Sequence, residues 1–161
     1  MRQNWDETWM SMAEVISKRS TCTNRQVGCM IVDTNNRPIS AGYNGPPSGF
    51  RPLPVQDTND CSAYCPRSNS NERGIDYGNC VSVHAEMNAL MFADRRDYFS
   101  GTIYVTSPCC YDCAKAVSNS GVKRVVVKLG TKDSHADVEK GLAFLKECGV
   151  KIEIMKDEEH V

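Results

Sequence analysis

His84, Cys110 and Cys113 are the residues of this 161-residue chain whose types and spacing point most directly to chemistry. One histidine and two thiolates give Zn²⁺ three protein ligands and leave the fourth tetrahedral position for water, as in a catalytic site. Zinc lowers the pKa of that water to about 7, so hydroxide is available in neutral solution. Cys110 and Cys113 are spaced i, i+3 at a predicted helix start, where the helix dipole and free N–H groups favour thiolates. The sequence therefore predicts a hydrolytic zinc site.

Glu86 follows His84 by two positions, at the start of a run with helical apolar spacing. Residues two apart on a helix do not share a face, so we expect this carboxyl to lie beside the metal without binding it. As general base it would take a proton from the water and give it to a ring nitrogen while hydroxide attacks the amine-bearing carbon, and it would then help ammonia leave. A His-x-Glu followed by a Cys-x-x-Cys is the signature of zinc-dependent nucleobase deamination.

The cysteine pair departs from that signature at one position. A proline is expected directly before the first ligand, but the order here is Pro108, Cys109, Cys110. Only Cys110 has the two-residue gap to Cys113, so Cys109 takes the usual proline position and is not expected to bind metal. A Cys-x-x-Cys alone also fits a structural zinc half-site or a redox pair, and a His-x-Glu alone also fits an ordinary helix start. The two motifs together favour the catalytic interpretation.

A second group of cysteines lies in and before a long polar insertion, at about residues 46–80, that has no sustained hydrophobic period. A structureless loop of this length inside a compact domain is unusual unless it is functional or held in place. Four thiolates would complete a structural zinc site and replace the core that the insertion lacks; they are Cys22, Cys61, Cys65 and Cys80. The alternative is a mobile loop with free thiols.

Composition narrows the class of protein. The length suits one domain, residues 1–161, with a substantial core. A formal net charge of −1 argues against a protein that grips nucleic acid mainly by phosphate attraction. Nothing resembles a signal peptide and no apolar run is long enough to span a bilayer, so we expect a cytoplasmic protein. In a reducing compartment, nine cysteines more often bind metal than pair as disulfides.

Apolar spacing predicts helices and strands that alternate along most of the chain. An amphipathic helix is expected from Asn4 to about Ser17, docking on the core through Trp5, Trp9, Met12, Ala13 and Ile16. A short polar turn predicts an antiparallel hairpin of the first two strands, and helical crossovers predict parallel pairing of the last three. We expect a three-layer α/β/α fold around a five-stranded mixed sheet. Its strands are at 27–32, 38–43, 102–106, 122–129 and around 152–154, and its other helices are at 84–95, 110–120 and 136–148.

Six stretches of the chain resemble the deoxycytidylate deaminases of the zinc-dependent cytidine deaminase superfamily, in the style of phage and bacterial members. The superfamily is marked by His-Ala-Glu and Cys-x-x-Cys, and the deoxycytidylate branch by Tyr-Asn-Gly and the cysteine-bearing insertion. The stretches are Arg25-Gln26-Val27-Gly28, Gly42-Tyr43-Asn44-Gly45, His84-Ala85-Glu86-Met87-Asn88-Ala89-Leu90, Tyr104-Val105-Thr106, Cys110 to Lys115 and Ser120-Gly121-Val122-Lys123-Arg124.

The resemblance implies hydrolysis of dCMP to dUMP and ammonia, supplying thymidylate synthesis. It also implies a homohexamer that dCTP activates and dTTP inhibits, with Mg²⁺ at the regulatory nucleotide site. By position, Asn44 would contact the sugar hydroxyl and Arg25 the phosphate, with Val27 and Ala85 as further substrate-binding residues. Residues Gly42, Tyr43, Asn44 and Gly45 would contribute to the regulatory site, and Arg95 to a subunit contact. Relatives often place histidine in the second metal site; this chain has none there, so the ligand set of that site stays open.

Three rival functions share parts of this pattern. An editing deaminase that acts on tRNA or single-stranded DNA would use the same zinc site but needs a basic, aromatic-lined groove, and the near-neutral charge counts against it. A free-nucleoside deaminase resembles the chain less, because its last strands form a hairpin. A catalytically inactive nucleotide sensor would not need Glu86, which is present.

Overall fold

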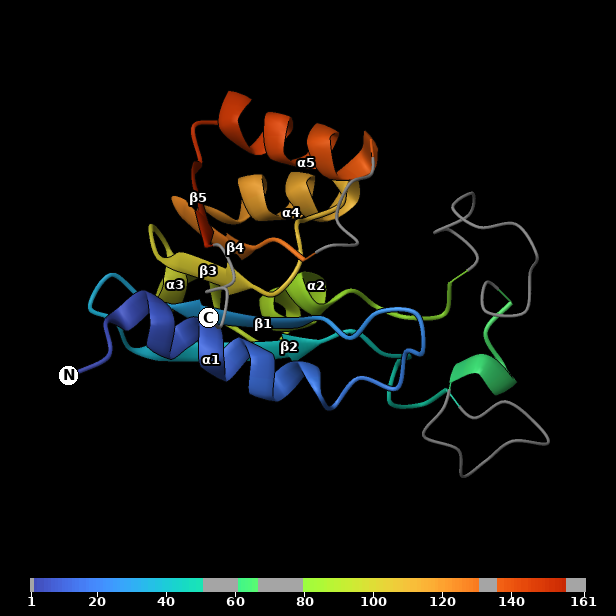
Figure 1. The fold of residues 1–161 in the computed structure, drawn as a ribbon. Coiled ribbons are helices and arrows are strands. Elements are labelled where there is room, and N and C mark those ends of the chain that lie inside the picture. The colour runs from blue at the N-terminus through green and yellow to red at the C-terminus, as the bar shows by residue number, and fades with distance from the viewer. Residues whose placement is uncertain (1, 51–60, 67–79, 131–135, 156–161) are drawn as a thin grey trace, which may run out of the picture.

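The computed structural model describes residues 2–50, 61–66, 80–130 and 136–155. Five strands form one mixed sheet in the order β2-β1-β3-β4-β5, with helices on both of its faces (Figure 1). This confirms the predicted α/β fold and five-stranded mixed sheet. The strands are β1 (Gly28–Val32), β2 (Pro38–Tyr43), β3 (Thr102–Val105), β4 (Arg124–Lys128) and β5 (Lys151–Met155). The helices are α1 (Trp5–Ser17), the 3₁₀ helix η1 (Cys61–Ala63), α2 (Ala85–Met91), α3 (Arg95–Tyr98), α4 (Tyr111–Ser120) and α5 (Ala136–Glu147).

The sheet joins a hairpin to a parallel unit. β1 and β2 run antiparallel, with Gly28 opposite Tyr43, whereas β3, β4 and β5 run parallel to one another. β1 also pairs antiparallel with β3, placing Cys29 opposite Val105. The prediction had named only the hairpin as antiparallel, so this second antiparallel junction is a finding of the structure. It brings the end of β3 next to the start of β1.

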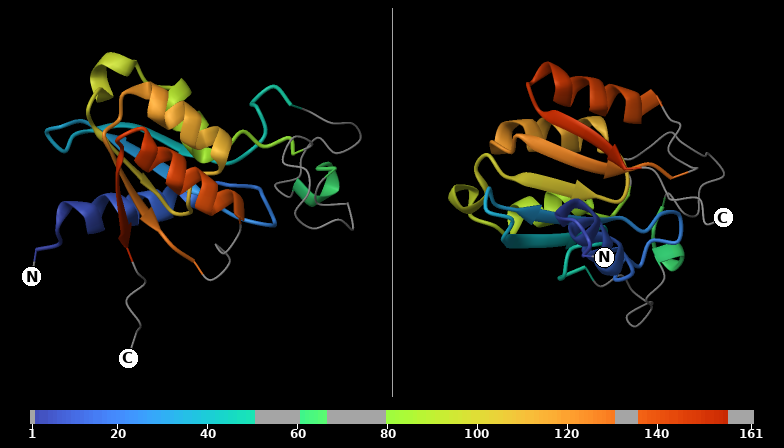
Figure 2. Two further views of the ribbon diagram at one scale, coloured as in Figure 1. Left: turned by 90° about the horizontal axis from the view of Figure 1, so that it is seen from above. Right: turned by 60° about the vertical axis from the view of Figure 1, so that its left-hand side comes forward.

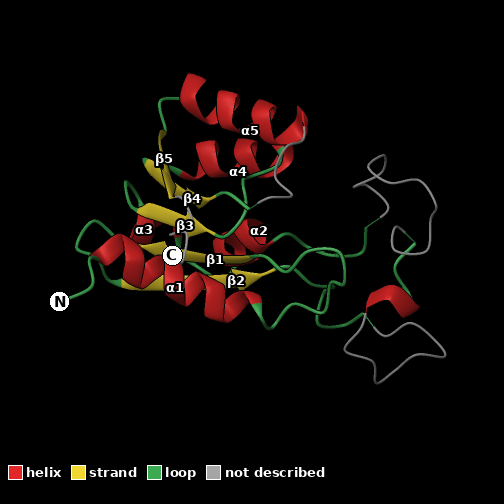
Figure 3. Ribbon diagram, viewed as in Figure 1, coloured by secondary structure: helices red, strands yellow, loops and turns green. Residues whose placement is uncertain are grey.

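Side chains alternate between the two faces of the sheet, as the pleat requires. Along β1, Cys29 and Ile31 enter the core with α2, α4 and α5, while Met30 and Val32 pack in the core under α1. Figure 3 shows α1 crossing in front of β1 and β2 and the pair α4 and α5 above β3 and β4, and Figure 2 shows the same pair side by side from two further directions. The metal-ligand motifs therefore lie on one face, and α1 covers the other.

The predicted docking face of α1 is wrong in part. Trp9 and Ala13 are buried as expected, but Trp5 and Met12 are 48% and 44% exposed, and Met10 is buried instead. The reason is that Asp6 occupies the sheet-facing stripe, one turn before Trp9 and Met10. Its carboxylate accepts hydrogen bonds from Tyr104 and Arg124 of the sheet. A polar anchor on the inner face rotates the helix away from the stripe that apolar spacing alone had indicated.

The single helix predicted for residues 84–95 is also wrong. α2 ends at Met91, and α3 begins at Arg95 after its N-cap residue, Asp94. The Asp94 carboxylate accepts a 2.9 Å hydrogen bond from the backbone N–H of Arg96. Because aspartate stabilises a helix start in this way, the chain turns and begins a new helix. Arg95 therefore opens α3 and is not the last residue of the helix that carries Glu86.

The insertion is closed at its base by a two-residue bridge. Gly45 and Val83 exchange backbone hydrogen bonds of 3.1 and 2.8 Å, which ties the segment after β2 to the residue just before His84. Residues 51–60 and 67–79 of the insertion lie outside the described part. Among the described residues, none of the helices has the length and apolar character that crossing a bilayer requires.

Candidate metal centre

The starts of α2 and α4 meet on one side of the sheet and bring three ligand atoms together. His84 is the N-cap residue of α2 and Cys110 that of α4. The Nδ1 atom of His84 lies 3.4 Å from the sulfur of Cys110 and 3.3 Å from that of Cys113. Zn–S and Zn–N bonds of about 2.3 and 2.0–2.1 Å would place such atoms about 3.6 Å apart in a tetrahedron. Among the described residues, these three alone form a group with ligand atoms within 4.8 Å of one another. The set fits Zn²⁺.

The electrostatics of the two sulfurs favour a bound cation. A hydrogen bond from the Cys113 thiol lowers the pKa of Cys110 to about 4, with His84 adding to the effect. The same hydrogen bond, together with burial, raises the pKa of Cys113. The backbone N–H of Cys113 also donates to the Cys110 sulfur over 3.5 Å. Because metal ligands bind as thiolates, both sulfurs would release their protons when a divalent cation binds.

Glu86 lies in the first turn of α2 and is only 4% exposed. Burial raises the pKa of its carboxyl, and this shift is opposed by the backbone N–H of Glu86 itself and by His84. Its oxygen atoms do not belong to the three-ligand group found among the described residues. A buried carboxyl next to a metal site, but outside its ligand group, is placed for proton transfer.

Cys109 directly precedes Cys110 and interacts with Glu86. It is fully buried, its thiol is hydrogen-bonded to the carboxyl of Glu86, and Cys29 is a neighbour. Burial, followed by the charge of Glu86, raises the pKa of the Cys109 thiol well above its usual value. The residue in the usual proline position thus contacts the carboxyl of Glu86.

This arrangement agrees with the comparison to known protein families. The family model described as "Cytidine and deoxycytidylate deaminase zinc-binding region" matches residues 3–129. The chain belongs to this family. It is 39% identical over 131 residues to the deoxycytidylate deaminase of Mycobacterium phage D29, covering 78% of this chain and 94% of the phage protein. It is 36% identical over 154 residues to the deoxycytidylate deaminase of Schizosaccharomyces pombe, covering 94% of this chain but only 44% of the yeast protein.

A solved structure of the family superimposes over nearly the whole chain. The dCMP deaminase of cyanophage S-TIM5 in its apo form matches with a TM-score of 0.69 and 28% identity, covering 96% of this chain and 100% of that one. The same phage enzyme in complex with dCMP and dUMP matches with a TM-score of 0.69 and 27% identity. This family member therefore shares the fold of an enzyme that has been seen with both nucleotides bound.

Three of the residues to which the family resemblance assigns substrate contacts are joined by hydrogen bonds in the structure. The Asn44 side chain is buried, accepts a 2.7 Å hydrogen bond from the backbone N–H of Val27 and donates a 2.9 Å bond to the backbone carbonyl of Arg25. The Arg25 guanidinium donates a 2.9 Å bond to the hydroxyl of Ser107, three residues before Cys110. Ala85 is buried beside Glu86. Their contacts with a nucleotide stay predictions.

Two residues that support the site were missed at the sequence level. Asn88 of α2 donates a 2.7 Å hydrogen bond to the backbone carbonyl of Tyr43, and Ser107 receives the bond from Arg25. A signal for Asn88 was present: asparagine is a poor helix former, so its place inside the helix two residues after Glu86 indicates a partner outside the helix. Ser107 carried no such signal.

The predicted regulatory segment has structural contacts of its own. Gly42 is buried in β2, where a Cβ atom would lie 2.2 Å from the carbonyl oxygen of Ala85. The backbone of α2 therefore fills this face of Gly42. Gly45 forms the bridge to Val83, and the guanidinium of Arg95 lies 4.9 Å from the ring centre of Phe99. The roles of residues 42–45 in nucleotide binding and of Arg95 in a subunit contact stay predictions.

The structure does not bring the second cysteine group together as a metal site: all four cysteines are described, but no three of their sulfurs lie within 4.8 Å of one another. Cys61 and Cys65 are buried, and the thiols of Cys22 and Cys61 interact, with burial as the main cause of the raised pKa of Cys22. The backbone N–H of Cys61 donates a 3.0 Å hydrogen bond to Thr21, so η1 is attached to the turn after α1. Cys80 is half-buried. All nine cysteines lie in the described part and none forms a disulfide.

Proposed function

We propose that this chain catalyses the hydrolytic deamination of dCMP to dUMP and ammonia. The observation that carries the proposal is the cluster of His84 Nδ1 with the sulfurs of Cys110 and Cys113, next to the buried carboxyl of Glu86. The choice of dCMP is supported by relatives that carry the name deoxycytidylate deaminase and by the phage enzyme with dCMP and dUMP bound.

In the proposed reaction, three residues of the site bind the metal and a fourth transfers protons. Zn²⁺ held by His84, Cys110 and Cys113 would supply a water molecule that loses its proton near neutral pH. The Glu86 carboxylate accepts that proton and delivers it to the pyrimidine ring nitrogen while the amine-bearing carbon is attacked. It would next carry the proton of the newly added hydroxyl group to the amine, so that the carbon–nitrogen bond breaks, ammonia leaves and the carbonyl of dUMP forms. Burial of Glu86 keeps its pKa above the ordinary value, which favours proton delivery.

We assign the nucleotide contacts to the end of the sheet where the loop after α1 meets the turn before α4. Arg25 is the phosphate ligand, because its guanidinium is held at Ser107, close in sequence to the metal ligands. Asn44 contacts the sugar hydroxyl, and its own bonds to the backbone of Arg25 and Val27 fix its position. Val27 and Ala85 line the base.

The finer properties of the proposal come from the family resemblance. The chain would be a single-domain cytoplasmic enzyme whose dUMP supplies thymidylate synthesis. Its activity would be raised by dCTP and lowered by dTTP, each bound with Mg²⁺ at residues 42–45. A homohexamer with Arg95 at a contact is supported by large apolar side chains near it, since exposed apolar patches mark interfaces. Met91, Phe92 and Phe99 are 59%, 80% and 50% exposed. The mass of the particle in solution, and its fall on Phe92→Glu substitution, test this.

The substrate is tested by ammonia release from dCMP, CMP, deoxycytidine and a short tRNA stem-loop, each alone and with dCTP or dTTP. The proposal expects dCMP to be the preferred substrate. Faster release from the stem-loop would identify an editing deaminase, and release from none of the four would identify a nucleotide sensor. A change in rate with dCTP or dTTP tests regulation separately from catalysis.

A second zinc, bound by Cys22, Cys61, Cys65 and Cys80, is tested by metal content. Two zinc ions per chain, falling to one on Cys61→Ser substitution with deamination retained, would support it. One ion per chain in the unsubstituted protein, together with three ligands at the His84 site, would show that the insertion has free thiols.

A further inference from the structure

Gly141 lies in the interior of α5, and its buried backbone is packed against the turn that carries the metal ligands. A Cβ atom at Gly141 would lie 2.2 Å from the carbonyl oxygen of Cys109 and 3.2 Å from the carbonyl carbon of Cys110. Ordinary van der Waals contact begins at 3.4 Å, so a larger residue would force α5 and the turn apart by roughly 1 Å. Only glycine allows this close approach.

The backbone angle at residue 141 does not require glycine. Of the glycines described, positive φ angles occur at Gly121 and Gly149, not at Gly141. Glycine in a helix interior costs stability relative to alanine because it loses more backbone freedom on folding. The close contact with the ligand turn is therefore the feature of the structure that accounts for glycine at this position.

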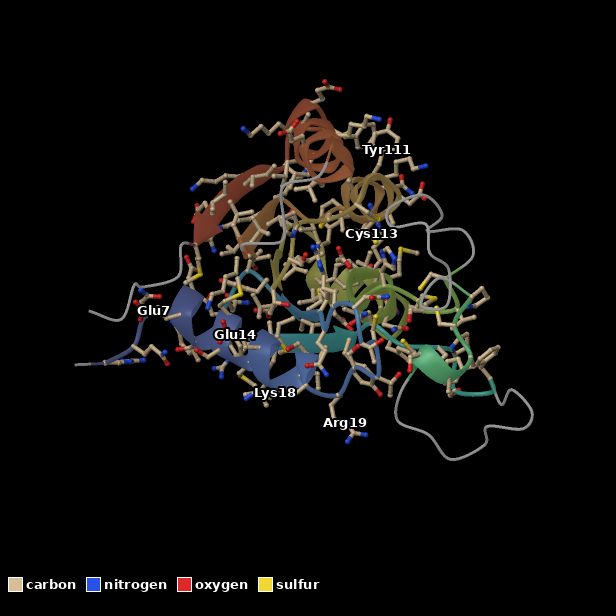
Figure 4. The ribbon with its side chains drawn as sticks, turned by 45° about the vertical axis from the view of Figure 1, so that its right-hand side comes forward. Glu7, Glu14, Lys18, Arg19, Tyr111 and Cys113 are labelled. Atoms are coloured by element: carbon tan, nitrogen blue, oxygen red, sulfur yellow. The ribbon has the colours of Figure 1, made fainter. Side chains whose placement is uncertain are left out.

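A second contact between α5 and the turn involves Tyr111, the residue that follows Cys110. The ring of Phe144 packs edge-on against Tyr111, with 5.2 Å between ring centres and 68° between planes. Tyr111 directly follows Cys110 and begins α4. Figure 4 shows Tyr111 on the α5 side of α4 and Cys113 between α4 and α2. α5 thus touches each of the three successive residues 109–111.

We propose that Gly141 is a positioning residue for the metal centre: through it, α5 fixes the backbone of Cys109 and Cys110 and thereby the Cys110 sulfur. That sulfur lies 3.4 Å from His84 Nδ1 and 3.5 Å from the backbone nitrogen of Cys113. Zinc sites require ligand distances within about 0.2 Å of their usual values, so a backbone shift of roughly 1 Å disrupts the set. The inference rests on the zinc site of the proposed function.

The test compares two glycine substitutions with similar clashes. In Gly141→Ala the new methyl group meets Cys109; in Gly101→Ala it would lie 2.2 Å from the carbonyl oxygen of Val32, at the opposite end of β3 from the ligand turn. Both variants should lose stability. Only Gly141→Ala should bind zinc more weakly, by about 10- to 100-fold, measured by competition with a chromophoric chelator at a temperature where both variants are folded.

Two additional measurements make the result decisive. The visible spectrum of bound Co²⁺ should change in Gly141→Ala and stay unchanged in Gly101→Ala, because it reports ligand geometry directly. If Gly141→Ala does not fold, Phe144→Ala removes the ring contact without a clash and should weaken zinc binding by a few-fold. Zinc affinity equal to that of the unsubstituted protein in these α5 variants, or an equal loss in Gly101→Ala, would overturn the inference. Failure of the unsubstituted protein to bind zinc would instead overturn the proposed function.

Discussion

The side-chain amide of Asn88 donates a 2.7 Å hydrogen bond to the backbone carbonyl of Tyr43 and a longer one, of 3.4 Å, to that of Val83. It therefore fastens α2 to the end of β2 and to the strand-like residue that precedes His84. The contact of Gly42 with Ala85 holds the same helix at a second point. Glu86 and His84 are placed by these main-chain contacts as much as by the helix itself.

Removal of this amide should disturb the site without touching its chemical groups. In Asn88→Ala the carbonyl of Tyr43 loses its partner, so we expect the free energy of unfolding to fall by about 1–3 kcal/mol, with a lower kcat. The exposed Asn119 of α4 offers the control Asn119→Ala, which should change neither quantity. Denaturant unfolding and steady-state kinetics check both. Unchanged stability in Asn88→Ala would show that the bond contributes little.

Glu86→Gln should abolish proton transfer while leaving the metal in place. We expect kcat for dCMP to fall by about 10²- to 10⁴-fold, because the amide is nearly isosteric but cannot accept and return a proton. Zinc content should remain that of the unsubstituted protein, since Glu86 is outside the ligand group. The control Glu139→Gln changes an exposed carboxyl on α5 and should leave kcat unchanged. Normal turnover by Glu86→Gln would refute the assigned mechanism.

Loss of one sulfur ligand should remove the catalytic zinc. Cys110→Ser replaces a thiolate of lowered pKa with a hydroxyl that does not ionise near neutral pH, so zinc bound at this site should fall to a small fraction and activity should disappear. Cys148 is exposed, and Cys148→Ser should keep both. Atomic absorption after dialysis measures the metal. Full zinc retention in Cys110→Ser would place the ion elsewhere.

The proposed phosphate contact predicts a selective loss of affinity. In Arg25→Ala, a charge-assisted hydrogen bond worth about 1.5–3 kcal/mol is removed, so KM for dCMP should rise by about 10- to 100-fold. KM for deoxycytidine, which has no phosphate, should change little. The Arg96→Ala variant, in which an 87% exposed side chain is removed, serves as the control. An equal rise for both substrates would mean that Arg25 acts only by supporting Ser107.

Stability should fall in acid through the ion pairs of Arg124. Its guanidinium binds Asp6 and Glu153, lowering the pKa of Asp6 and bringing that of Glu153 to about 2. Because both carboxyls have depressed pKa values in the folded state, their stabilisation is present above about pH 4, the unfolded value, and is lost as the pH falls toward 2.

Both carboxylates are 33% exposed, so after screening we expect a loss of about 1 kcal/mol across this range. Unfolding in urea at pH 5 and pH 2.5 measures it. Arg124→Met should flatten this part of the profile, whereas Arg19→Met, at an exposed arginine after α1, should not. An unchanged slope in Arg124→Met would assign the acid sensitivity to other carboxyls.

The sequence by itself was enough to predict the candidate chemistry of this protein. The spacing of His84, Glu86, Cys110 and Cys113 is local, and ligand preference follows from residue type, so the metal, the open coordination position and the separate acid could all be predicted. The strands and most helices were also predictable, because hydrophobic period is a local property. The hairpin ends and the boundaries of β2 followed from its turn residues.

Only the tertiary structure decided which elements meet. His84 and Cys113 are 29 residues apart, and their contact depends on the pairing of β1 with β3 and on the close approach of α2 to Gly42. The inward position of Asp6, the break between α2 and α3, and the packing of α5 on Cys109 at Gly141 likewise depend on partners distant in the chain. Periodicity reports which side of an element is apolar. It does not report which backbone packs against a glycine or which carboxylate forms an ion pair with an arginine.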